Sequence, residues 1–166
     1  CILNIMNKDN RCFLWSTLAA LHPQITHATR VSHYEPFESE LNMDGIEFLV
    51  SPDDIPRIEK QNPTILYSPH VREWTKAENK AIFRPYKVAS LEDVRDKRHV
   101  QLLLVTKKQD GVLLYHWVLI KDFNKMCSTG EEKRTVCPYC ICSYYGHHDG
   151  IKWLEQHQKT CRGMGV

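Results

Sequence analysis

The sequence lacks any apolar run long enough to cross a membrane. Its longest uninterrupted apolar stretches, residues 112–115 and 117–120, are far shorter than the roughly 20 residues that a membrane-spanning helix needs. It also lacks an excess of one charge, because 22 basic and 20 acidic residues leave a formal net charge of only +2. We therefore expect no membrane span, and any binding of nucleic acid must come from a local site rather than from bulk electrostatics.

Internal repeats, low-complexity tracts and the composition of a disordered chain are absent as well. With 42% hydrophobic and 25% charged residues, the chain can bury a core. No basic segment followed by an apolar stretch and a small-residue cleavage site precedes the first element, and the first residue is Cys1 rather than Met. We expect a piece of a longer chain, and its 166 residues fit one domain with a small appended module.

What the chain does contain is an uneven distribution of its seven cysteines. Four of them gather near the C-terminal end, at Cys137, Cys140, Cys142 and Cys161. This clustering and the odd total favour a metal site over a disulfide scaffold. Reduced thiols indicate an intracellular location, either nuclear or cytoplasmic.

The periodicity of apolar residues predicts an α+β fold. Helical spacing begins after Asp9 or Asn10, either of which can cap a helix, and Pro23 ends it. The dipeptide Asp110-Gly111 is a hairpin signal between two strong strands. The expected strands are 46–50, 64–67, 83–88, 99–106 and 112–120, and a short helix is expected from Pro52 to about Lys60.

A charged, turn-rich stretch divides the chain. Residues 129–136 predict an exposed linker. We therefore expect an α+β domain over residues 1–128 and a Cys-Cys-His-Cys zinc finger over residues 137–163.

Two correctly spaced ligand pairs predict the zinc site. Cys137 and Cys140 lie on a tight knuckle, whereas His157 and Cys161 lie one helical turn apart. Tetrahedral Zn²⁺ takes such thiolate and imidazole ligands, and four protein ligands make a closed, structural site for one ion. Residues 141–156 separate the pairs, which is longer than the roughly 12 residues of ordinary fingers. Cys142, His147 and His148 are alternative ligands.

The finger helix predicts the kind of contact that the module makes. Its polar positions mix both charges and carry no arginine suited to guanine: Lys152, Glu155, Gln156, Gln158 and Lys159. A single finger also offers little surface for tight sequence-specific binding. The sequence therefore favours a protein contact or a nonspecific nucleic-acid contact over a sequence-reading DNA-binding finger.

A second constellation has the order of papain-like thiol hydrolases. Cys12 opens the predicted helix, where the helix dipole lowers a thiol pKa; His116 lies on the strongest strand, and Asp122 follows that strand. In this hypothesis His116 takes the thiol proton and Asp122 or Asn124 orients the imidazole, while backbone N–H groups at Arg11 and Cys12 bind the oxyanion of a polypeptide substrate. The alternative is a buried core cysteine and a hydrogen-bonded strand histidine.

Several blocks of the chain resemble a region of large proteins from Maverick/Polinton-type transposons and related virus-like elements of animals. The matching blocks cover residues 7–16, 18–23, 30–34, 54–62, 99–105 and 115–122, together with the cysteine and histidine finger. In that family the region lies upstream of a protein-primed type-B DNA polymerase. The resemblance implies an accessory role in mobile-element DNA replication, and the chain itself carries no polymerase motif.

A shorter similarity runs to OTU-like and other papain-like cysteine peptidases. It is carried by residues 9–12 and by His116-Trp117. This similarity implies a papain-like mixed core of helix and antiparallel sheet. Two functions are therefore expected as alternatives: an accessory binding domain with a structural finger, or an active deubiquitinase-like cysteine peptidase.

Overall fold

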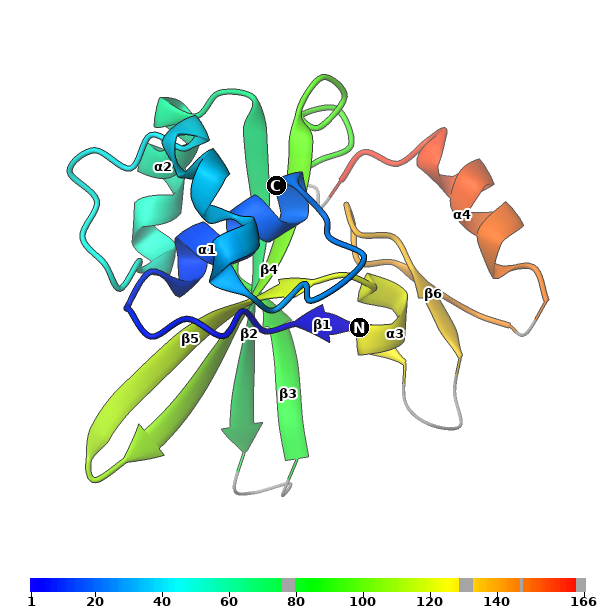
Figure 1. Cartoon of the computed structure of the whole chain (residues 1–166). Coiled ribbons are helices and arrows are strands. Elements are labelled where there is room, and N and C mark those ends of the chain that lie inside the picture. Colours follow the sequence, from blue (N-terminus) through cyan, green and yellow to red (C-terminus); the bar gives the residue numbers. More distant parts are fainter. Residues whose placement is uncertain (76–79, 129–132, 147, 164–166) are drawn as a thin grey trace.

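The computed structural model describes residues 1–75, 80–128, 133–146 and 148–163. It consists of a five-stranded sheet, helices on one of its faces, and a smaller unit with a two-stranded sheet that covers part of the other (Figure 1). The predicted α+β class is confirmed. A papain-like relationship stays a prediction.

The main sheet is mostly antiparallel. Its order is β1-β5-β4-β2-β3. Only β2 and β4 pair in parallel, whereas β1 with β5, β5 with β4, and β2 with β3 are antiparallel. The strands are β1 (Ile2–Leu3), β2 (Ile65–Thr75), β3 (Lys80–Pro85), β4 (Arg98–Gln109) and β5 (Val112–Ile120).

The turn between β4 and β5 forms where the sequence predicts it. Asp110 has a φ of 50° and Gly111 a φ of 80°. Two consecutive left-handed residues suit the primed turns that join twisted strands, and the pair Asp-Gly tolerates them. The hairpin extends beyond the helices that cover the sheet (Figure 1).

Helix α1 (Cys12–Leu21) covers one face of the sheet along β5 and β4 (Figure 1). It has no polar stripe, and every residue from Cys12 to Ala19 is buried, as expected for a helix enclosed in a core. Its two polar residues are satisfied: Thr17 Oγ1 donates to the Phe13 carbonyl at 2.9 Å and Ser16 Oγ to the Trp117 carbonyl at 3.2 Å. Pro23 follows the helix end as predicted.

The start of α1 differs from the expected side-chain cap. The N-cap residue is Arg11, and no side chain caps the helix. Asp9 Oδ1 instead accepts the backbone N–H of Arg11 at 3.0 Å, and the Asp9 carboxylate also accepts Trp15 Nε1–H. Burial raises the pKa of Asp9, but hydrogen bonds from Asn7, Arg11 and Trp15 together outweigh it and lower that pKa.

Three short 3₁₀ turns and one helix complete this side of the molecule. Helix α2 (Ile55–Gln61) agrees with the predicted short helix. It follows a 3₁₀ turn in which Ser51 and Asp54 form a reciprocal capping box. The 3₁₀ turns are Val31–His33, Glu35–Glu40 and Pro52–Asp54.

The strand expected at residues 46–50 does not form. This segment is irregular, and side chains rather than a neighbouring strand occupy its carbonyls. Trp117 Nε1 donates to the Val50 carbonyl at 2.8 Å, and Asn10 Nδ2 donates to that of Phe48 at 3.2 Å. Its apolar residues are explained by core packing, because Ile46 and Val50 are buried with α1.

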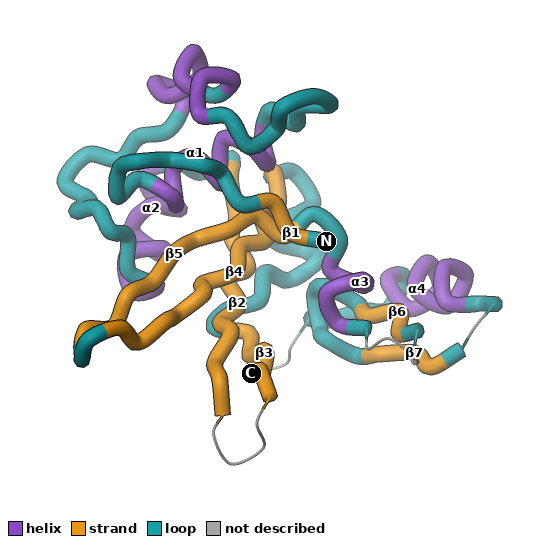
Figure 2. The backbone as a smooth tube through the Cα atoms, turned by 60° about the horizontal axis from the view of Figure 1, so that its bottom comes forward, coloured by secondary structure: helices purple, strands orange, loops and turns teal. Residues whose placement is uncertain are grey.

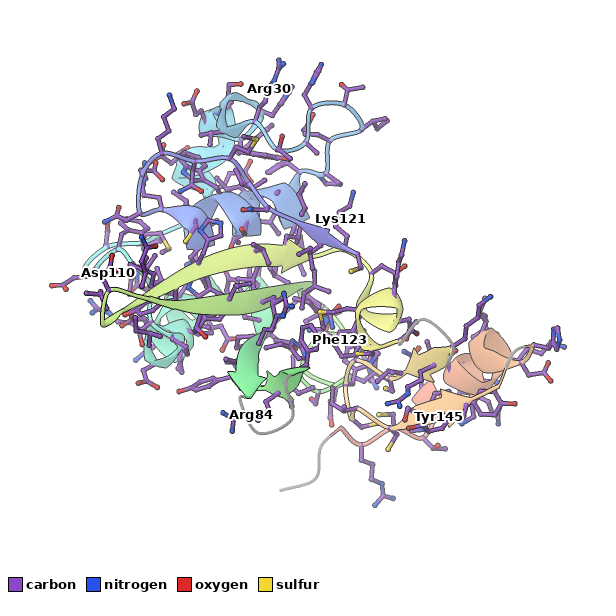
Figure 3. All side chains as sticks on the ribbon, turned by 90° about the horizontal axis from the view of Figure 1, so that it is seen from below. Arg30, Arg84, Asp110, Lys121, Phe123 and Tyr145 are labelled. Atoms are coloured by element: carbon purple, nitrogen blue, oxygen red, sulfur yellow. The ribbon has the colours of Figure 1, made fainter. Side chains whose placement is uncertain are left out.

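The second face of the sheet packs against the C-terminal part of the chain. Helix α3 (Phe123–Cys127) and strand β6 (Arg134–Val136) contact each other, and Val136 shares a buried cluster with Phe123, Met126 and the sheet. Phe123 lies between the sheet and this C-terminal unit (Figure 3). The sheet contributes Leu103, Val118 and Ile120 to the cluster.

The finger consists of β6, β7 (Ser143–Tyr145) and α4 (Gly150–Gln158). Strands β6 and β7 form the separate two-stranded sheet, grouped with α3 and α4 in Figure 2. The predicted linker over residues 129–136 therefore ends in a strand, and residues 129–132 of that prediction lie outside the described residues. None of the helices in the described parts of the chain has the length and apolarity to cross a membrane.

The shared cluster predicts that the packing of α3 against the sheet stabilises the fold. Met126→Ala, at a residue 8% exposed, should lower the free energy of unfolding by about 2–5 kcal/mol because it removes a buried side chain and leaves a cavity. Urea denaturation followed by tryptophan fluorescence measures the loss. Met6→Ala, at a residue 76% exposed, is the matched control and should change stability by less than about 0.5 kcal/mol. Equal stability of both variants would contradict the shared core.

Candidate metal centre

Three segments of the finger bring four metal-ligating side chains together. Cys137 follows β6 and Cys140 lies in the following turn, whereas His157 lies on α4 and Cys161 follows this helix. Their ligand atoms all lie within 4.8 Å of one another. The described chain thus contains a Cys₃His cluster that can hold one metal ion, at the four positions that the spacing predicts.

The separation of two of the sulfurs suits a tetrahedral ion. The sulfurs of Cys137 and Cys161 are 3.8 Å apart, close to the roughly 3.8 Å edge of a tetrahedron whose metal–sulfur bonds are about 2.3 Å. Cys140 Sγ lies 3.0 Å from His157 Nε2. Three thiolates and one imidazole are a donor set that suits Zn²⁺, and four protein ligands leave no open position for a substrate.

The turn that carries the two knuckle cysteines is fixed by backbone hydrogen bonds. Ile141 N–H donates to the Cys137 carbonyl, and Cys137 N–H donates to that of Cys142, both at 2.9 Å. Ile141 has a φ of 63°, a left-handed conformation that is uncommon for a β-branched residue. Burial raises the pKa of the Cys137 and Cys140 thiols, so metal binding must displace their protons.

Aromatic rings orient the histidine ligand. The ring of Trp153 stacks on that of His157, with centroids 4.9 Å apart and an interplanar angle of 15°. Its centroid also lies 5.7 Å from that of Tyr144 on β7. These contacts fix the plane of the imidazole in the folded finger, as groups around metal ligands commonly do.

The alternative ligands do not enter the described cluster. Cys142 is exposed and is not among the four clustered residues. His148 lines a separate cavity between α3 and the finger. His147 lies outside the described residues.

In the structure the predicted Cys12, His116 and Asp122 each contact groups outside that set. Cys12 is 1% exposed, and its Sγ accepts the backbone N–H of Trp117 at 3.4 Å. Side chains alternate along a strand, so the ring of His116 lies on the opposite face from Trp117, which packs on Phe13 of α1. His116 Nε2 contacts Asn4 Oδ1 at 2.7 Å.

The other groups of that hypothesis have structural roles. Asp122 caps α3 by accepting the backbone N–H of Lys125 at 2.9 Å, and Asn124 Oδ1 accepts that of Val136 at 2.7 Å. Burial raises the pKa of Cys12, the opposite of the activation that a nucleophile needs. As placed, Cys12 is a core thiol, which is the alternative that the sequence left open.

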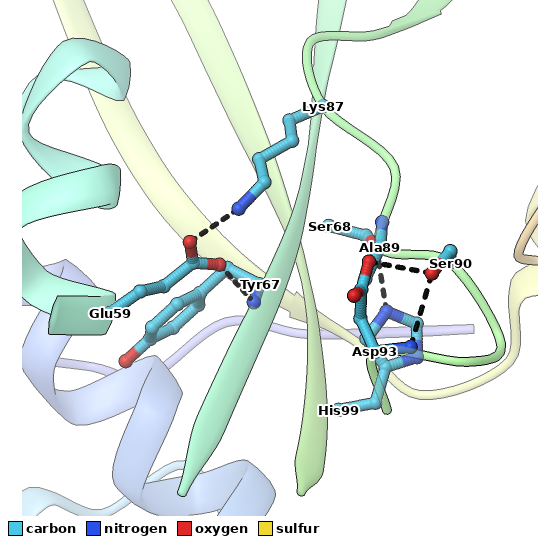
Figure 4. Close-up of polar contacts among 8 residues, drawn as sticks. All are labelled: Glu59, Tyr67, Ser68, Lys87, Ala89, Ser90, Asp93 and His99. Carbon is cyan, nitrogen blue, oxygen red and sulfur yellow. Dashed lines mark hydrogen bonds and ion pairs between the residues drawn. The ribbon is translucent and has the colours of Figure 1, made fainter. Parts of the chain in front are cut away.

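A buried polar network near the finger was not predicted from the sequence. Ala89 N–H donates to Ser68 Oγ at 2.9 Å, and this hydroxyl lies 2.7 Å from His99 Nε2 (Figure 4). The centroid of the His99 ring lies 5.5 Å from that of Tyr139 in the knuckle. Burial, with a smaller repulsion from His70, lowers the pKa of His99 to about 4. Strand histidines were visible in the sequence, but the partner Ser68 lies on another strand.

The chain matches no family model, no curated protein and no solved structure in the comparisons with known proteins. The metal centre is therefore supported by its own geometry and donor chemistry alone.

The donor set predicts one tightly bound Zn²⁺ per chain. Cys140→Ser should lower zinc affinity at least about tenfold, because a hydroxyl is a poor substitute for a thiolate. Competition with a chromogenic chelator measures the affinity. Cys142→Ser is the matched control and should bind zinc as the wild type does. Affinity should fall as the pH is lowered, since protons compete for the thiolates.

The lowered pKa of His99 predicts that the stability of the fold depends on pH. Its folded pKa lies below its unfolded value, so the unfolded chain binds more protons and stability falls as the pH drops from about 6.5 toward 4. From pH 7 to pH 5 the wild type should lose on the order of 1–2 kcal/mol more than His99→Gln. Urea unfolding at both pH values measures this difference. His27→Asn, at an exposed position, should behave as wild type, and an unchanged pH dependence in His99→Gln would contradict the assignment.

Proposed function

We propose that this chain is a zinc-organised accessory domain of a mobile-element or virus-like DNA replication protein, and that its C-terminal finger contacts nucleic acid. The observation that carries the proposal is the approach of Cys137, Cys140, His157 and Cys161 to within 4.8 Å of one another. The replication context rests on the sequence resemblance, since such a region precedes a protein-primed polymerase in those elements.

Zinc is proposed as the ion because the donor set is soft and closed. Zn²⁺ supplies a rigid crosslink and no redox chemistry when it is bound to such residues. The finger has little core of its own, because none of the residues of α4 is buried. Metal binding therefore contributes directly to the folding of the finger.

The charge of the chain limits how the finger contacts nucleic acid. A net charge of +2 gives no overall attraction to phosphate. The contact is local, and it depends on the metal because the ligands connect β6 with α4.

A protein contact is the second candidate, and the β4–β5 hairpin favours it. Four consecutive apolar residues of β5 are exposed at this tip: Val112 60%, Leu113 57%, Leu114 48% and Tyr115 36%. These residues pair with β4 on one side, whereas among the described strands β1 covers the other edge of β5 at Leu119 and Ile120. An open apolar edge of this kind is unusual in isolated domains. The tip at Asp110 and the finger at Tyr145 lie at opposite ends of the molecule (Figure 3), so both contacts can exist together.

The alternative of an active cysteine peptidase is not favoured by the placement of Cys12. A Cys-His pair needs the sulfur within hydrogen-bond reach of the imidazole. Cys12 is instead buried, with its sulfur against the backbone of Trp117, and the imidazole of His116 contacts Asn4.

Zinc-dependent binding of nucleic acid tests the proposal. The zinc-loaded chain should bind a fluorescein-labelled single-stranded oligonucleotide, measured by fluorescence anisotropy at low salt. Cys140→Ser should weaken this binding at least about tenfold, because the finger no longer closes. Cys142→Ser should bind as the wild type does. Equal affinity of the zinc-free and zinc-loaded chain would contradict the proposal.

A further inference from the structure

A cavity of about 660 Å³ lies between α3 and the finger. Its walls come from α3 and the residues after it, from the start of β6, and from the first turn of α4. The contact of α3 with β6 is held by hydrogen bonds: Arg134 N–H donates to Ser128 Oγ at 3.2 Å and Val136 N–H to Asn124 Oδ1 at 2.7 Å. The cavity is therefore bounded by elements that are fixed relative to each other.

Positive charge dominates the described lining of this cavity. Lys125, Lys133 and Arg134 line it, and the lining carboxylate is Asp122. One oxygen of Asp122 already accepts the backbone N–H of Lys125 at 2.9 Å. Lys125 belongs to α3, whereas Lys133 and Arg134 lie at the start of β6, so cations line the cavity from two sides, and Arg134 also interacts with another group of the chain.

Neutral hydrogen-bond donors add to the cationic lining. Thr135, Gly150 and Ile151 also line the cavity. Asp149 precedes α4, and its side chain makes no cap hydrogen bond to the first turn. Gly150 lets this turn approach β6 closely, because a Cβ there would lie 2.0 Å from Thr135 Oγ1.

An aromatic ring borders the cationic wall. The guanidinium of Arg134 lies over the ring of Tyr145, 4.8 Å from its centroid. Tyr145 is 60% exposed, whereas the neighbouring rings of Tyr144 and Trp153 stack on each other. Cations that follow a phosphate backbone and an exposed ring that accepts a base are the two components of single-strand recognition.

We propose that the cavity between α3 and the finger binds the phosphodiester groups of single-stranded nucleic acid, with Tyr145 as the platform for a base. This inference rests on the proposed nucleic-acid contact and gives it a location. This binding mode differs from that of a finger that reads DNA through the polar face of its helix. In the proposed mode, Lys152 on α4 and Lys159 just after it are not the principal contacts.

Two charge-matched double variants of the full, zinc-loaded chain test this location. Lys125→Gln with Lys133→Gln removes two cations from the cavity, and Lys152→Gln with Lys159→Gln removes two from the exposed side of α4. Anisotropy of a labelled oligothymidylate is measured over a range of salt concentrations. Zinc stoichiometry and circular dichroism of each variant establish that the finger is folded.

The cavity variant should bind about tenfold more weakly. The slope of log affinity against log salt should fall by about 1.4, since each lost single-strand phosphate contact contributes about 0.7. The α4 variant should stay within about twofold of wild type. Tyr145→Leu should weaken binding about fivefold or more through lost stacking.

Each other outcome overturns a defined part of the account. Equal losses in the two double variants, or a loss in the α4 variant alone, would overturn the cavity as the binding site while leaving the nucleic-acid contact in place. Inorganic phosphate that competes at the same concentration as the oligonucleotide would show a small-anion site instead. A wild-type chain that binds no oligonucleotide would overturn the proposed function itself.

Discussion

The main sheet carries apolar side chains on both of its faces, because β4 and β5 alternate between two buried clusters. Leu102, Leu104 and Trp117 face α1, whereas Leu103 and Val118 face the C-terminal unit. Both faces must be covered to remove this surface from water. The N-terminal helix covers one face, and α3 with the finger covers part of the other. The folding of the finger therefore matters for the main sheet as well, because the finger helps to cover its second face.

The finger cannot cover that face through its own core alone. Helix α4 has no buried residue, and the contribution of the finger to the second cluster is Val136 with the half-buried Ile141. The four ligands after β6, in the knuckle, on α4 and just after it can hold one ion, which would crosslink these segments in place of the missing core. An ion bound there would also fix the aromatic stack around Trp153 and the cavity beside α3.

Trp117 on β5 connects α1 with the irregular segment that ends at Val50, on the face of the sheet that α1 covers. Its indole N–H donates to the Val50 carbonyl at 2.8 Å and its ring packs edge-on against Phe13. Its backbone N–H and carbonyl are bound by Cys12 and Ser16, which lie one helical turn apart on α1. In this structure Cys12 helps to attach α1 to β5.

The sequence predicts those features that depend on local patterns. The Asp110-Gly111 turn, helix α1 and the four metal ligands follow from spacing and from backbone preferences over a few residues. The prediction of a strand at residues 46–50 was wrong. Apolar alternation cannot distinguish a paired strand from a loop whose carbonyls accept hydrogen bonds from distant side chains such as Trp117. The cysteine and histidine hypothesis depended on which face of β5 each group occupies, and spacing alone does not fix this.

Sequence patterns could not predict two other features for the same reason: the network of Ser68 and His99, and the cavity beside α3. Each assembles groups from segments that are distant in the chain, and their approach depends on sheet order and on the docking of the finger. A parallel pairing of β2 with β4 brings Ser68 next to Gln101 and hence near His99. No local signal carries such a pairing.

X-ray absorption at the zinc edge of the metal-loaded chain identifies the atoms that hold the ion. We expect a four-coordinate shell of three sulfurs at about 2.3 Å and one nitrogen at about 2.0–2.1 Å, supplied by Cys137, Cys140, Cys161 and His157. A shell of four sulfurs would mean that Cys142 displaces His157 and that α4 is not crosslinked to the knuckle by its histidine. A shell dominated by oxygen would contradict the metal centre altogether.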